Sequence, residues 1–586
     1  MKTLLVAINS KYIHSNLAVR YLKSYASPHK DNIKILEYTI NQQVDDILHS
    51  IYMEKPDLIA ISTYIWNVDL VNILIRELRK VMPNTKIWLG GPEVSYNSKD
   101  YLLNHEEVDG IMVGEGEETF KELLDYYSRT KDASNRSLEE IRGLVFRSGQ
   151  EIIQTGPRPI LDFSKVPFPY DSLDDLENKI IYYESSRGCP FSCSYCLSSV
   201  DKTIRLRDIE LVKEELNFFI ARKVKQVKFV DRTFNCNRKH TREVWKHIMD
   251  NDNGITNFHF EVAADLLSDE EINLLNSMRS GLVQLEIGVQ STNPETIKAI
   301  SRKTNFDKIS ENVRRVRENR NVHQHLDLIA GLPHEDLESF KNSFNEVYGL
   351  RPDQLQLGFL KVLKGTPIVM DAKEFGIVHR DIAPYEVLFT NWLSFDDVLT
   401  LKLVEEMVEV YYNSSQFGTS IKFMEHYFDS YFDLYRELGE HYKDKGLLDI
   451  KHTRIRRYEI LLDFMEPKLS SIDGFKEILI YDLYLREKLK SRPSFAVDED
   501  ENRDIYRRIY SEDELRKKYL GIDKAIDSLG KAKRYFHIEK FKVDVVRSAK
   551  EGKYIYDPQL IVFNYKDRDP MNNNANTKII KDEIID

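Results

Sequence analysis

Cysteine is scarce in this sequence: four of its 586 residues are cysteines. So few cysteines in so long a chain cannot form a disulfide scaffold, which excludes the small disulfide-rich classes. The sequence also lacks an uninterrupted run of about 18 apolar residues, so we expect no membrane-spanning helix and no membrane partner. Its first apolar stretch, LLVAI, is short for a signal peptide and no small-residue cleavage site follows, so we expect a cytoplasmic protein.

Repeats and excess positive charge are also lacking. We find no internal repeat at the periods typical of solenoids. The net charge is −11, which argues against a protein that coats nucleic acid by neutralising phosphates. A chain of 586 residues is too long for a single hydrophobic core and should form several domains.

The first 130 residues alternate apolar strands with amphipathic helices. This alternation predicts a parallel, doubly wound, Rossmann-like α/β sheet over residues 1–130. The expected strands are residues 3–9, 32–39, 57–63, 85–91 and 109–114. Residues 131–180 are polar and proline-containing, and they predict a linker with one short hairpin.

A second β/α series is expected over residues 181–375. Its predicted strands are residues 180–186, 224–231, 258–266, 281–289, 323–332 and 354–363. Six strands favour an open, partial (β/α)6 barrel over a closed barrel of eight strands. Residues 376–586 predict a mainly helical C-terminal domain that helps to shape the substrate pocket, and the final residues, from about 566, are expected to be poorly ordered.

Three of the four cysteines lie within eight positions, in the sequence ESSRGCPFSCSYCLSS. Cys189, Cys193 and Cys196 have the spacing C-x3-C-x2-C, whereas structural zinc sites favour pairs of C-x2-C. Three thiolates on one loop can ligate three irons of a [4Fe–4S] cluster and leave the fourth open to a ligand. A zinc knuckle or three unrelated thiols are the alternatives. Cys236 stands apart, as a structural or a substrate-facing thiol.

This segment resembles the radical S-adenosylmethionine (SAM) superfamily, including the aromatic Tyr195 before the last cysteine. The resemblance implies that SAM chelates the open iron and that an electron from the reduced cluster cleaves it to a 5′-deoxyadenosyl radical. The three cysteines are then the catalytic cluster ligands. An external electron donor of the flavodoxin or ferredoxin type would supply the electron.

Residues 181–370 are similar to the radical SAM branch that contains anaerobic coproporphyrinogen oxidases and methylthiotransferases. The resemblance implies that Tyr195, Asp231, Glu261, Gln290, Arg302, Asp327, Ile329 and Gly331 bind SAM. An arginine suits the SAM carboxylate, acids suit its ribose hydroxyls, and the backbone near residues 329–331 suits the adenine. Ordinary ion pairs and strand-end polar groups are the alternative interpretation of these residues.

The strand ends of the front region are rich in small and polar residues, and open α/β sheets bind ligands there. The region looks like the cobalamin-binding domain that precedes many radical SAM enzymes. On that resemblance the candidate cobalamin contacts are His14, Asn16, Ser62, Thr63, Tyr64, Trp66, Gly90, Gly91, Glu93, Gly114, Glu115 and Gly116. The family's D-x-H-x-x-G motif is missing, so either His14 ligates cobalt or no residue does. The alternative interpretation is that the glycines at these strand ends serve only as turn residues.

Together these features favour a cobalamin-dependent radical SAM enzyme that methylates an unactivated carbon of a small molecule or peptide. Relatives with this plan also perform cyclisation and ring rearrangement. A second hypothesis is modification of tRNA or another nucleic acid, because Lys and Arg interleave with aromatics in residues 451–459 and 531–542. A third is a non-enzymatic cobalamin sensor in which the cluster is structural.

Overall fold

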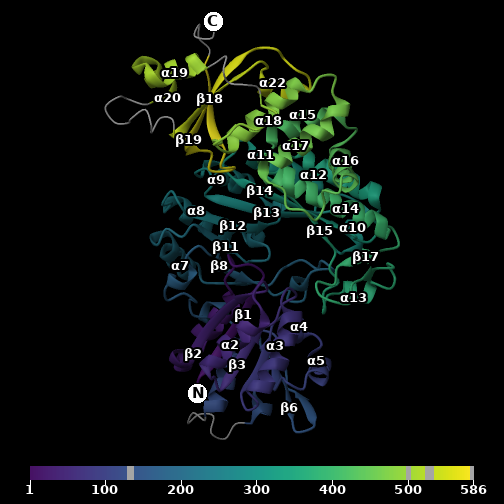
Figure 1. The fold of residues 1–586 in the computed structure, drawn as a ribbon. Helices are drawn as coiled ribbons and strands as arrows, with labels where there is room; N and C mark the ends of the chain where they lie inside the picture. The colour runs from purple at the N-terminus through teal and green to yellow at the C-terminus, as the bar shows by residue number, and fades with distance from the viewer. Residues whose placement is uncertain (129–136, 497–502, 522–533, 581–586) are drawn as a thin grey trace.

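The computed structural model describes residues 1–128, 137–496, 503–521 and 534–580. Three bodies follow one another along its length, with the front domain and the C-terminal domain at opposite ends of a central barrel (Figure 1). Within the described residues, no helix has the length and apolar character needed to cross a membrane.

The front domain is built on a seven-stranded sheet with the order β2-β1-β3-β4-β5-β6-β7. Its parallel strands are β1 (Thr3–Asn9), β2 (Ile33–Thr39), β3 (Leu58–Ser62), β4 (Lys86–Gly90) and β5 (Gly110–Met112). The main helices between them are α1 (Leu17–Tyr25), α2 (Val44–Glu54), α3 (Val68–Val81) and α6 (Glu117–Ser128). These elements confirm the predicted Rossmann-like fold.

Both faces of this sheet are apolar and covered. On β1, Leu4 and Val6 pack into one core with residues of α2 and α3. Leu5 and Ala7 point to the other side, where α1 and α6 complete a second core. A strand buried on both faces needs a continuous apolar run, which explains the sequence TLLVAIN.

The hairpin that was expected within the linker belongs to the front sheet. β6 (Leu144–Ser148) pairs antiparallel with β5, and β7 (Glu151–Gln154) pairs antiparallel with β6. Val145 joins one of the two cores and Leu144 and Phe146 join the other. The hairpin therefore continues the front domain beyond residue 130.

The central domain is a six-stranded, wholly parallel sheet with the order β15-β14-β13-β12-β11-β8. Its strands are β8 (Ile181–Tyr183), β11 (Gln226–Phe229), β12 (Asn257–Val262), β13 (Val283–Gln290), β14 (His323–Ala330) and β15 (Gln354–Phe359). Between them come α7 (Ile209–Ala221), α8 (Arg238–Asp250), α9 (Asp269–Ser277), α11 (Phe306–Arg317) and α12 (Leu337–Gly349). β8 and β15 are the two edges, so the barrel is open, as predicted.

The two faces of the barrel sheet differ in chemistry. On β13, Val283, Leu285 and Ile287 are buried in the core that the outer helices cover. The intervening Gln284 and Glu286 point to the inner face and are only half-buried. The same alternation along β14 places His325 and Asp327 on the inner face. The inner wall of the barrel is therefore polar.

The C-terminal region is mainly helical, as expected, and also contains a small sheet. Its longer helices are α14 (Phe395–Val408), α16 (Tyr431–Asp444), α17 (Arg454–Met465) and α18 (Asp473–Arg486). β18 (Phe536–Phe541), β19 (Gln559–Arg568) and β20 (Ala575–Ile580) form an antiparallel sheet. The expectation of disorder from about residue 566 is wrong up to residue 580, because β20 pairs with β19 and Ile580 is buried. Residues 581–586 lie outside the described residues.

Candidate active site: two adjoining cavities

The cysteine loop begins where β8 ends. After the short strand β9 (Ser186–Arg187), Gly188 adopts a φ of +89°, and a side chain there would strike the carbonyl oxygen of Thr203. This tight turn leads into Cys189, whose N–H donates to the carbonyl of Asp201. The loop is therefore anchored to the segment that returns to β10 (Arg205–Leu206).

All three cysteines of the loop line one cavity of about 200 Å³. Cys189 and Cys193 are buried, and Arg302 donates a hydrogen bond to the Cys193 sulfur at 3.6 Å. Burial raises the pKa of the Cys193 thiol, and Arg302 opposes that rise. No three His, Cys, Asp or Glu residues within the described ranges are arranged to hold a single metal ion. The triad thus lacks the compact geometry of a zinc site, whereas a cluster spreads its ligands over separate irons.

The cavity brings together most of the residues predicted to bind SAM. Its lining includes Tyr195, Glu261, Gln290, Arg302 and Asp327 beside the three cysteines. They come from the cysteine loop, the strands β12, β13 and β14, and the segment after α10 (Pro294–Ala299). The carboxyl ends of neighbouring parallel strands meet at one edge of a sheet, which is why residues distant in sequence converge here.

An ionic network lies below this cavity on the inner face of the barrel. Glu286 accepts a hydrogen bond from Lys228 at 2.9 Å and lies 3.0 Å from the His259 ring nitrogen Nε2. Although burial raises the pKa of Glu286, these two partners hold it well below its usual range. Glu286 is therefore a fixed negative charge.

Two further carboxylates, Glu261 and Asp327, face the cavity. The Glu261 side chain has no hydrogen bond or ion pair among the described residues, and Asp327 Oδ1 lies 3.2 Å from the His325 ring nitrogen Nε2 but accepts no hydrogen bond. Burial first, and then the charge of Glu286, raises the pKa of Glu261 to about 7. The same causes raise the pKa of Asp327. Acids with unused acceptor atoms in a buried pocket favour a ligand that brings hydroxyl donors or positive charge.

Gln290 marks the end of β13 with an unusual backbone. Its φ is +74°, and the pairing with β14 shifts register between Gly288 and Gln290. Its side-chain oxygen is buried without a donor. Arg302 likewise keeps its Nε atom without an acceptor, while its terminal nitrogens donate to Tyr195 and to the Gly288 carbonyl. An unused hydrogen-bond acceptor on Gln290 and an unused donor on Arg302 thus lie beside the three cysteines. This combination fits SAM, which carries a carboxylate, an ammonium group and hydroxyls.

Three of the predicted SAM residues do not line the cavity. Asp231 is fully buried and its carboxylate accepts hydrogen bonds from the N–H and hydroxyl of Ser185 and the hydroxyl of Ser186, at 2.6 to 2.9 Å. Asp231 thus braces the end of β8, and its carboxylate is buried away from the cavity in which an ammonium group would lie. Ile329 packs against the barrel core, and a side chain at Gly331 would collide with Val387.

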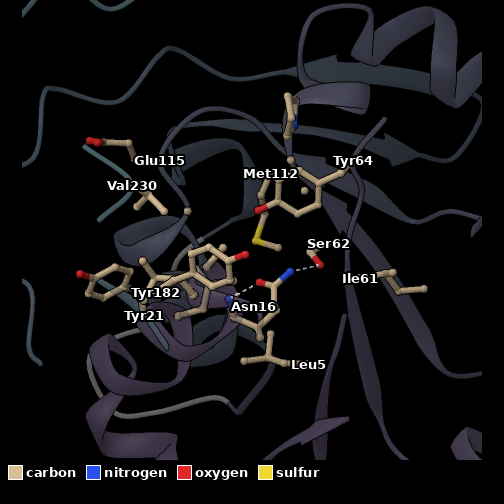
Figure 2. A pocket seen from close by; sticks show the side chains of 18 of the residues that line it. Leu5, Asn16, Tyr21, Ile61, Ser62, Tyr64, Met112, Glu115, Tyr182 and Val230 are labelled. Carbon is tan, nitrogen blue, oxygen red and sulfur yellow. Dashed lines mark hydrogen bonds between the residues drawn. The ribbon is translucent and has the colours of Figure 1, made fainter. Parts of the chain in front are cut away.

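A larger cavity of about 670 Å³ lies between the strand ends of the front sheet and the mouth of the barrel (Figure 2). Most of the predicted cobalamin residues line it: His14, Asn16, Ser62, Tyr64, Trp66, Gly90, Gly91, Gly114, Glu115 and Gly116. Its volume falls within the roughly 300–1,000 Å³ usual for ligand sites. Gly114 has a φ of +82°, and a side chain built there would meet nothing within 4 Å. The glycine loop therefore leaves backbone bare to a bulky ligand, as a cobalamin site requires.

Tyr64 and Trp66 form a flat aromatic wall of this cavity. Their rings stack with 4.4 Å between centroids and 6° between planes. Trp66 is fixed by a hydrogen bond from its indole N–H to the Ile8 carbonyl at 3.0 Å. A stacked, anchored pair suits the face of a macrocycle and excludes water from it.

His14 reaches across the cavity wall to the barrel. Its Nδ1 lies 2.6 Å from the hydroxyl of Tyr182 on β8, and His14 forms an isolated parallel bridge with Ile180. Burial, followed by the charges of Lys11 and Lys228, lowers the pKa of His14. The imidazole is thus neutral at pH 7, with Nδ1 engaged by Tyr182.

Two of the predicted cobalamin residues do not line the cavity. Thr63 is fully buried, and its backbone packs so closely on Gly91 that a side chain on Gly91 would strike the Thr63 carbonyl. Glu93 accepts hydrogen bonds from Tyr385 at 2.7 Å and Lys364 at 3.2 Å. It therefore joins the front domain to the segment that follows β15.

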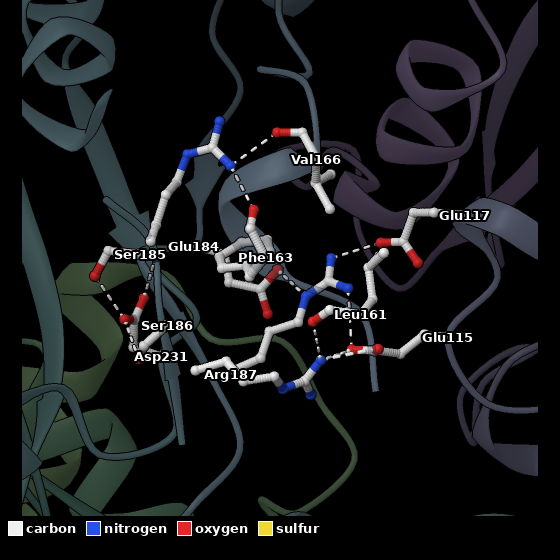
Figure 3. Close-up of polar contacts among 12 residues, drawn as sticks. Glu115, Glu117, Leu161, Phe163, Val166, Glu184, Ser185, Ser186, Arg187 and Asp231 are labelled. Carbon is white, nitrogen blue, oxygen red and sulfur yellow. Dashed lines mark hydrogen bonds and ion pairs between the residues drawn. The ribbon is translucent and has the colours of Figure 1, made fainter. Parts of the chain in front are cut away.

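A buried arginine ties the cysteine loop to the front domain (Figure 3). Arg187, two residues before Cys189, pairs with Glu115 at 3.1 Å and Glu117 at 2.6 Å, both from the front domain. It also pairs with Glu184 and stacks its guanidinium 4.5 Å from the Phe163 ring. The loop that carries the cysteines and the loop that lines the larger cavity are thus held by one side chain.

The sequence analysis missed the barrel residues that close the larger cavity. These are Tyr182, Glu184, Arg187, Val230 and Arg232. Their position directly at or after predicted strands 180–186 and 224–231 is the signal that points to them, because barrel chemistry sits at strand ends. Arg232 lines both cavities, so the two adjoin at this residue.

Comparison with known families agrees with this geometry. The profile of the B12-binding domain matches residues 3–124, and that of the radical SAM superfamily matches residues 183–347. The chain belongs to the cobalamin-dependent radical SAM family. Membership implies a [4Fe–4S] cluster, SAM and cobalamin as cofactors. Residues 373–563 match a third profile, described as a protein of unknown function (DUF4080).

Individual members of the family are similar to the chain at a distance. The cobalamin-dependent radical SAM methyltransferase TokK of Streptomyces tokunonensis is 25% identical over 348 residues, which cover 54% of this chain and 48% of that protein. An anaerobic magnesium-protoporphyrin IX monomethyl ester cyclase of Cereibacter sphaeroides is 22% identical over 361 residues, 57% of each chain. The chain spans about half the length of the curated relatives it matches.

One solved structure shares the fold of the present chain over most of the chain's length. The cobalamin-dependent SAM radical enzyme OxsB, with aqua-cobalamin bound, superposes with a TM-score of 0.58. The match covers 82% of this chain and 80% of that one, at 15% identity.

Proposed function

We propose that this protein is a cobalamin-dependent radical SAM methyltransferase that acts on an unactivated carbon. When bound, the cluster and SAM supply a 5′-deoxyadenosyl radical and cobalamin supplies a transferable methyl group. The protein's own part is to hold these groups at a fixed separation and to exclude water.

The observation that carries the proposal is the shared wall of the two cavities. Arg232 lines both the cysteine cavity and the larger front cavity. A substrate held at this wall touches the space of both cofactors, which a reaction that needs hydrogen abstraction and group transfer requires. The names of several relatives, TokK and a hopanoid C-3 methylase among them, support methylation.

Each set of residues has a distinct task. Cys189, Cys193 and Cys196 hold the cluster, and Arg302 aims its free Nε at the carboxylate of SAM. Glu261 and Asp327 accept hydrogen bonds from its hydroxyl or ammonium donors. In the front cavity the Tyr64–Trp66 stack would cover one face of the corrin, and His14, whose Nδ1 is engaged by Tyr182, would contact the cofactor from the cavity wall.

Two alternatives predict different products. A cyclase, as in the relatives of that name, would form 5′-deoxyadenosine without demethylating SAM. Modification of a nucleic acid rests on the basic residues 451–459 and 531–542. Arg454 and Arg456 of the first stretch pair with Glu487 and Glu459, and residues 531–533 of the second lie outside the described residues.

The test is anaerobic reconstitution with iron, sulfide and cobalamin, followed by SAM, a flavodoxin-type reductant and a small-molecule extract. We expect 5′-deoxyadenosine and S-adenosylhomocysteine together, in amounts that rise with the extract. 5′-Deoxyadenosine without S-adenosylhomocysteine would contradict methyl transfer and favour a rearrangement. Absence of 5′-deoxyadenosine would contradict radical chemistry altogether and leave the sensor hypothesis.

A cysteine comparison supplies the control. The triple variant Cys189→Ala, Cys193→Ala, Cys196→Ala should lose cluster iron and 5′-deoxyadenosine formation. Cys236→Ala should keep both, because Cys236 lines neither cavity and burial raises the pKa of its thiol to about 11. Equal iron loss in both variants would show that the triad is not the specific ligand set.

A further inference from the structure

Arg232 occupies a position that the two cofactors leave unexplained. It follows the buried Asp231 directly after β11, and its side chain is exposed to the two cavities that it lines. Asp231 is locked by Ser185 and Ser186, so the backbone that carries Arg232 is fixed to the end of β8. The backbone of Arg232 is therefore fixed, and its charged side chain extends into the wall that the two cavities share.

Apart from Arg232, the glutamates and the arginine that line the larger cavity neutralise one another's charges in ion pairs. Arg187 pairs with Glu115, Glu117 and Glu184 at 2.6 to 3.1 Å. The Arg232 side chain makes no ion pair or hydrogen bond with any described residue, and only its backbone carbonyl accepts a hydrogen bond, from the Thr233 hydroxyl. In the cysteine cavity, Arg302 is engaged by Tyr195 and Gly288, so Arg232 is again the cation without a partner.

Electrostatics place the Arg232 charge between the domains. Burial raises the pKa of Tyr64, on the front-domain side, and Arg232 is the largest effect opposing that rise. Burial and Glu286 raise the pKa of Glu261, on the barrel side, and Arg232 again opposes them. One guanidinium therefore acts on residues of both cavities.

A filled site changes the environment of this charge. With cobalamin in one cavity and SAM in the other, water is displaced from both sides of Arg232. A desolvated guanidinium without a counter-ion is costly, whereas a bidentate pair with a carboxylate or phosphate restores its hydrogen bonds. An anionic substrate that lies between the cofactors supplies such a pair.

We propose that Arg232 binds the carboxylate or phosphate of an anionic substrate held between the cobalamin and SAM sites. The inference rests on the proposed function and narrows its substrate class to acids. Arg232 then sets the position of the substrate carbon relative to both cavities. Neutral or cationic molecules would leave this charge buried and unpaired.

The first experiment detects the anion without any turnover. Protein loaded with cluster, SAM and aqua-cobalamin is treated with phenylglyoxal in the presence of acetate, inorganic phosphate or acetamide, and arginine modification is followed by peptide mass spectrometry. Acetate or phosphate should slow modification of Arg232 by about threefold or more relative to Arg547, an exposed arginine of the C-terminal domain, and acetamide should not. Equal slowing at both arginines overturns the inference.

The second experiment follows product. Small-molecule extract is separated on an anion-exchange resin, and each fraction is incubated with SAM that carries a deuterated methyl group. We expect labelled product from the retained, anionic fraction only. In Arg232→Gln the ratio of labelled product to 5′-deoxyadenosine should fall by about tenfold or more, with partial recovery in Arg232→Lys and no fall in Arg547→Gln.

The outcomes separate the two proposals. Protection of Arg232 by anions without any labelled product would refute methylation and keep the anion site. Labelled product from the neutral fraction, with an unchanged product ratio in Arg232→Gln, would refute the anion site and keep methylation. A tenfold loss of cobalamin affinity in Arg232→Gln would assign Arg232 to the phosphate of the cofactor and overturn the proposal.

Discussion

The front sheet and the barrel sheet are both parallel β/α constructions, yet they present opposite chemistry to a ligand. Every residue of β1 is buried, because helices cover both faces of the front sheet. On β13 and β14 buried and half-buried residues alternate, because helices cover only the outer face of the barrel. The number of covered faces therefore decides where polar side chains can lie.

This difference determines how each domain holds a cofactor. A sheet covered on both faces can bind a ligand only beyond its strand ends, so the front cavity is made of loops, glycines and the Tyr64–Trp66 stack. A sheet with one open face can bind through strand side chains, so the barrel offers Glu261, Glu286 and Asp327. We therefore expect the front site to recognise its ligand mainly by shape and the barrel site to recognise its ligand mainly by charge.

The largest expected effect tests the covered faces directly. Leu4→Ala and Leu5→Ala, on opposite faces of β1, should each lower the opening free energy of the front sheet by about 2–5 kcal/mol, because both leucines are fully buried. In the barrel Leu285→Ala should have an effect of that size, whereas Gln284→Ala should change stability by less than about 1 kcal/mol. Hydrogen exchange of the peptides that cover β1 and β13 measures the opening free energy of each sheet. A large loss in Gln284→Ala would break the comparison.

The next effect concerns recognition by shape. Gly114→Leu should weaken cobalamin binding by about 30-fold, roughly 2 kcal/mol, because the new side chain fills space at the bare glycine loop. Equilibrium dialysis of aqua-cobalamin gives the affinity. Gly149→Leu is the matched control, since Gly149 also has a positive φ and open surroundings but lies in the exposed hairpin. Equal losses in both variants would attribute the effect to backbone strain.

The smallest effect concerns recognition by charge. Glu261 has a pKa raised to about 7, so it is protonated below that pH and charged above it. If the charged form binds the cationic SAM, affinity should rise by about tenfold between roughly pH 6 and pH 8, and Glu261→Gln should flatten the dependence. Anaerobic calorimetry at each pH measures the affinity.

A second buried glutamate controls for the pH effect. Glu335 also has a pKa raised to about 7 by burial, but it accepts hydrogen bonds from Ser291 and Ser343 and lines neither cavity. Glu335→Gln should leave the pH dependence of SAM binding as it is. Flattening in this variant instead would place the titrating group outside the cavity.

Local sequence was sufficient for most of the strands and helices and for the grouping of the three candidate cluster ligands on one loop. The run TLLVAIN predicted β1 to the residue, because a strand buried on both faces is continuously apolar between its two ends. The cysteine spacing placed Cys189, Cys193 and Cys196 on one loop, because neighbours in sequence stay neighbours in space. The hairpin at 144–154 was expected, but its membership of the front sheet depended on pairing with β5, more than thirty residues earlier in the chain.

Side-chain partners were decided only by the tertiary structure. Asp231 and Glu93 are carboxylates like the cavity residues Glu261 and Glu115, but both already have protein partners. Asp231 accepts hydrogen bonds from Ser185 and Ser186. Glu93 accepts hydrogen bonds from Tyr385 and Lys364. Arg232 looked like any charged residue after a strand until the packing of the two domains left it unpaired at both cavities. The sequence by itself determined the strands, helices and cysteine loop, because these follow from periodicity and short-range spacing. Which polar groups stay free for a ligand depends on contacts between segments far apart in the chain, and only the folded arrangement decides those.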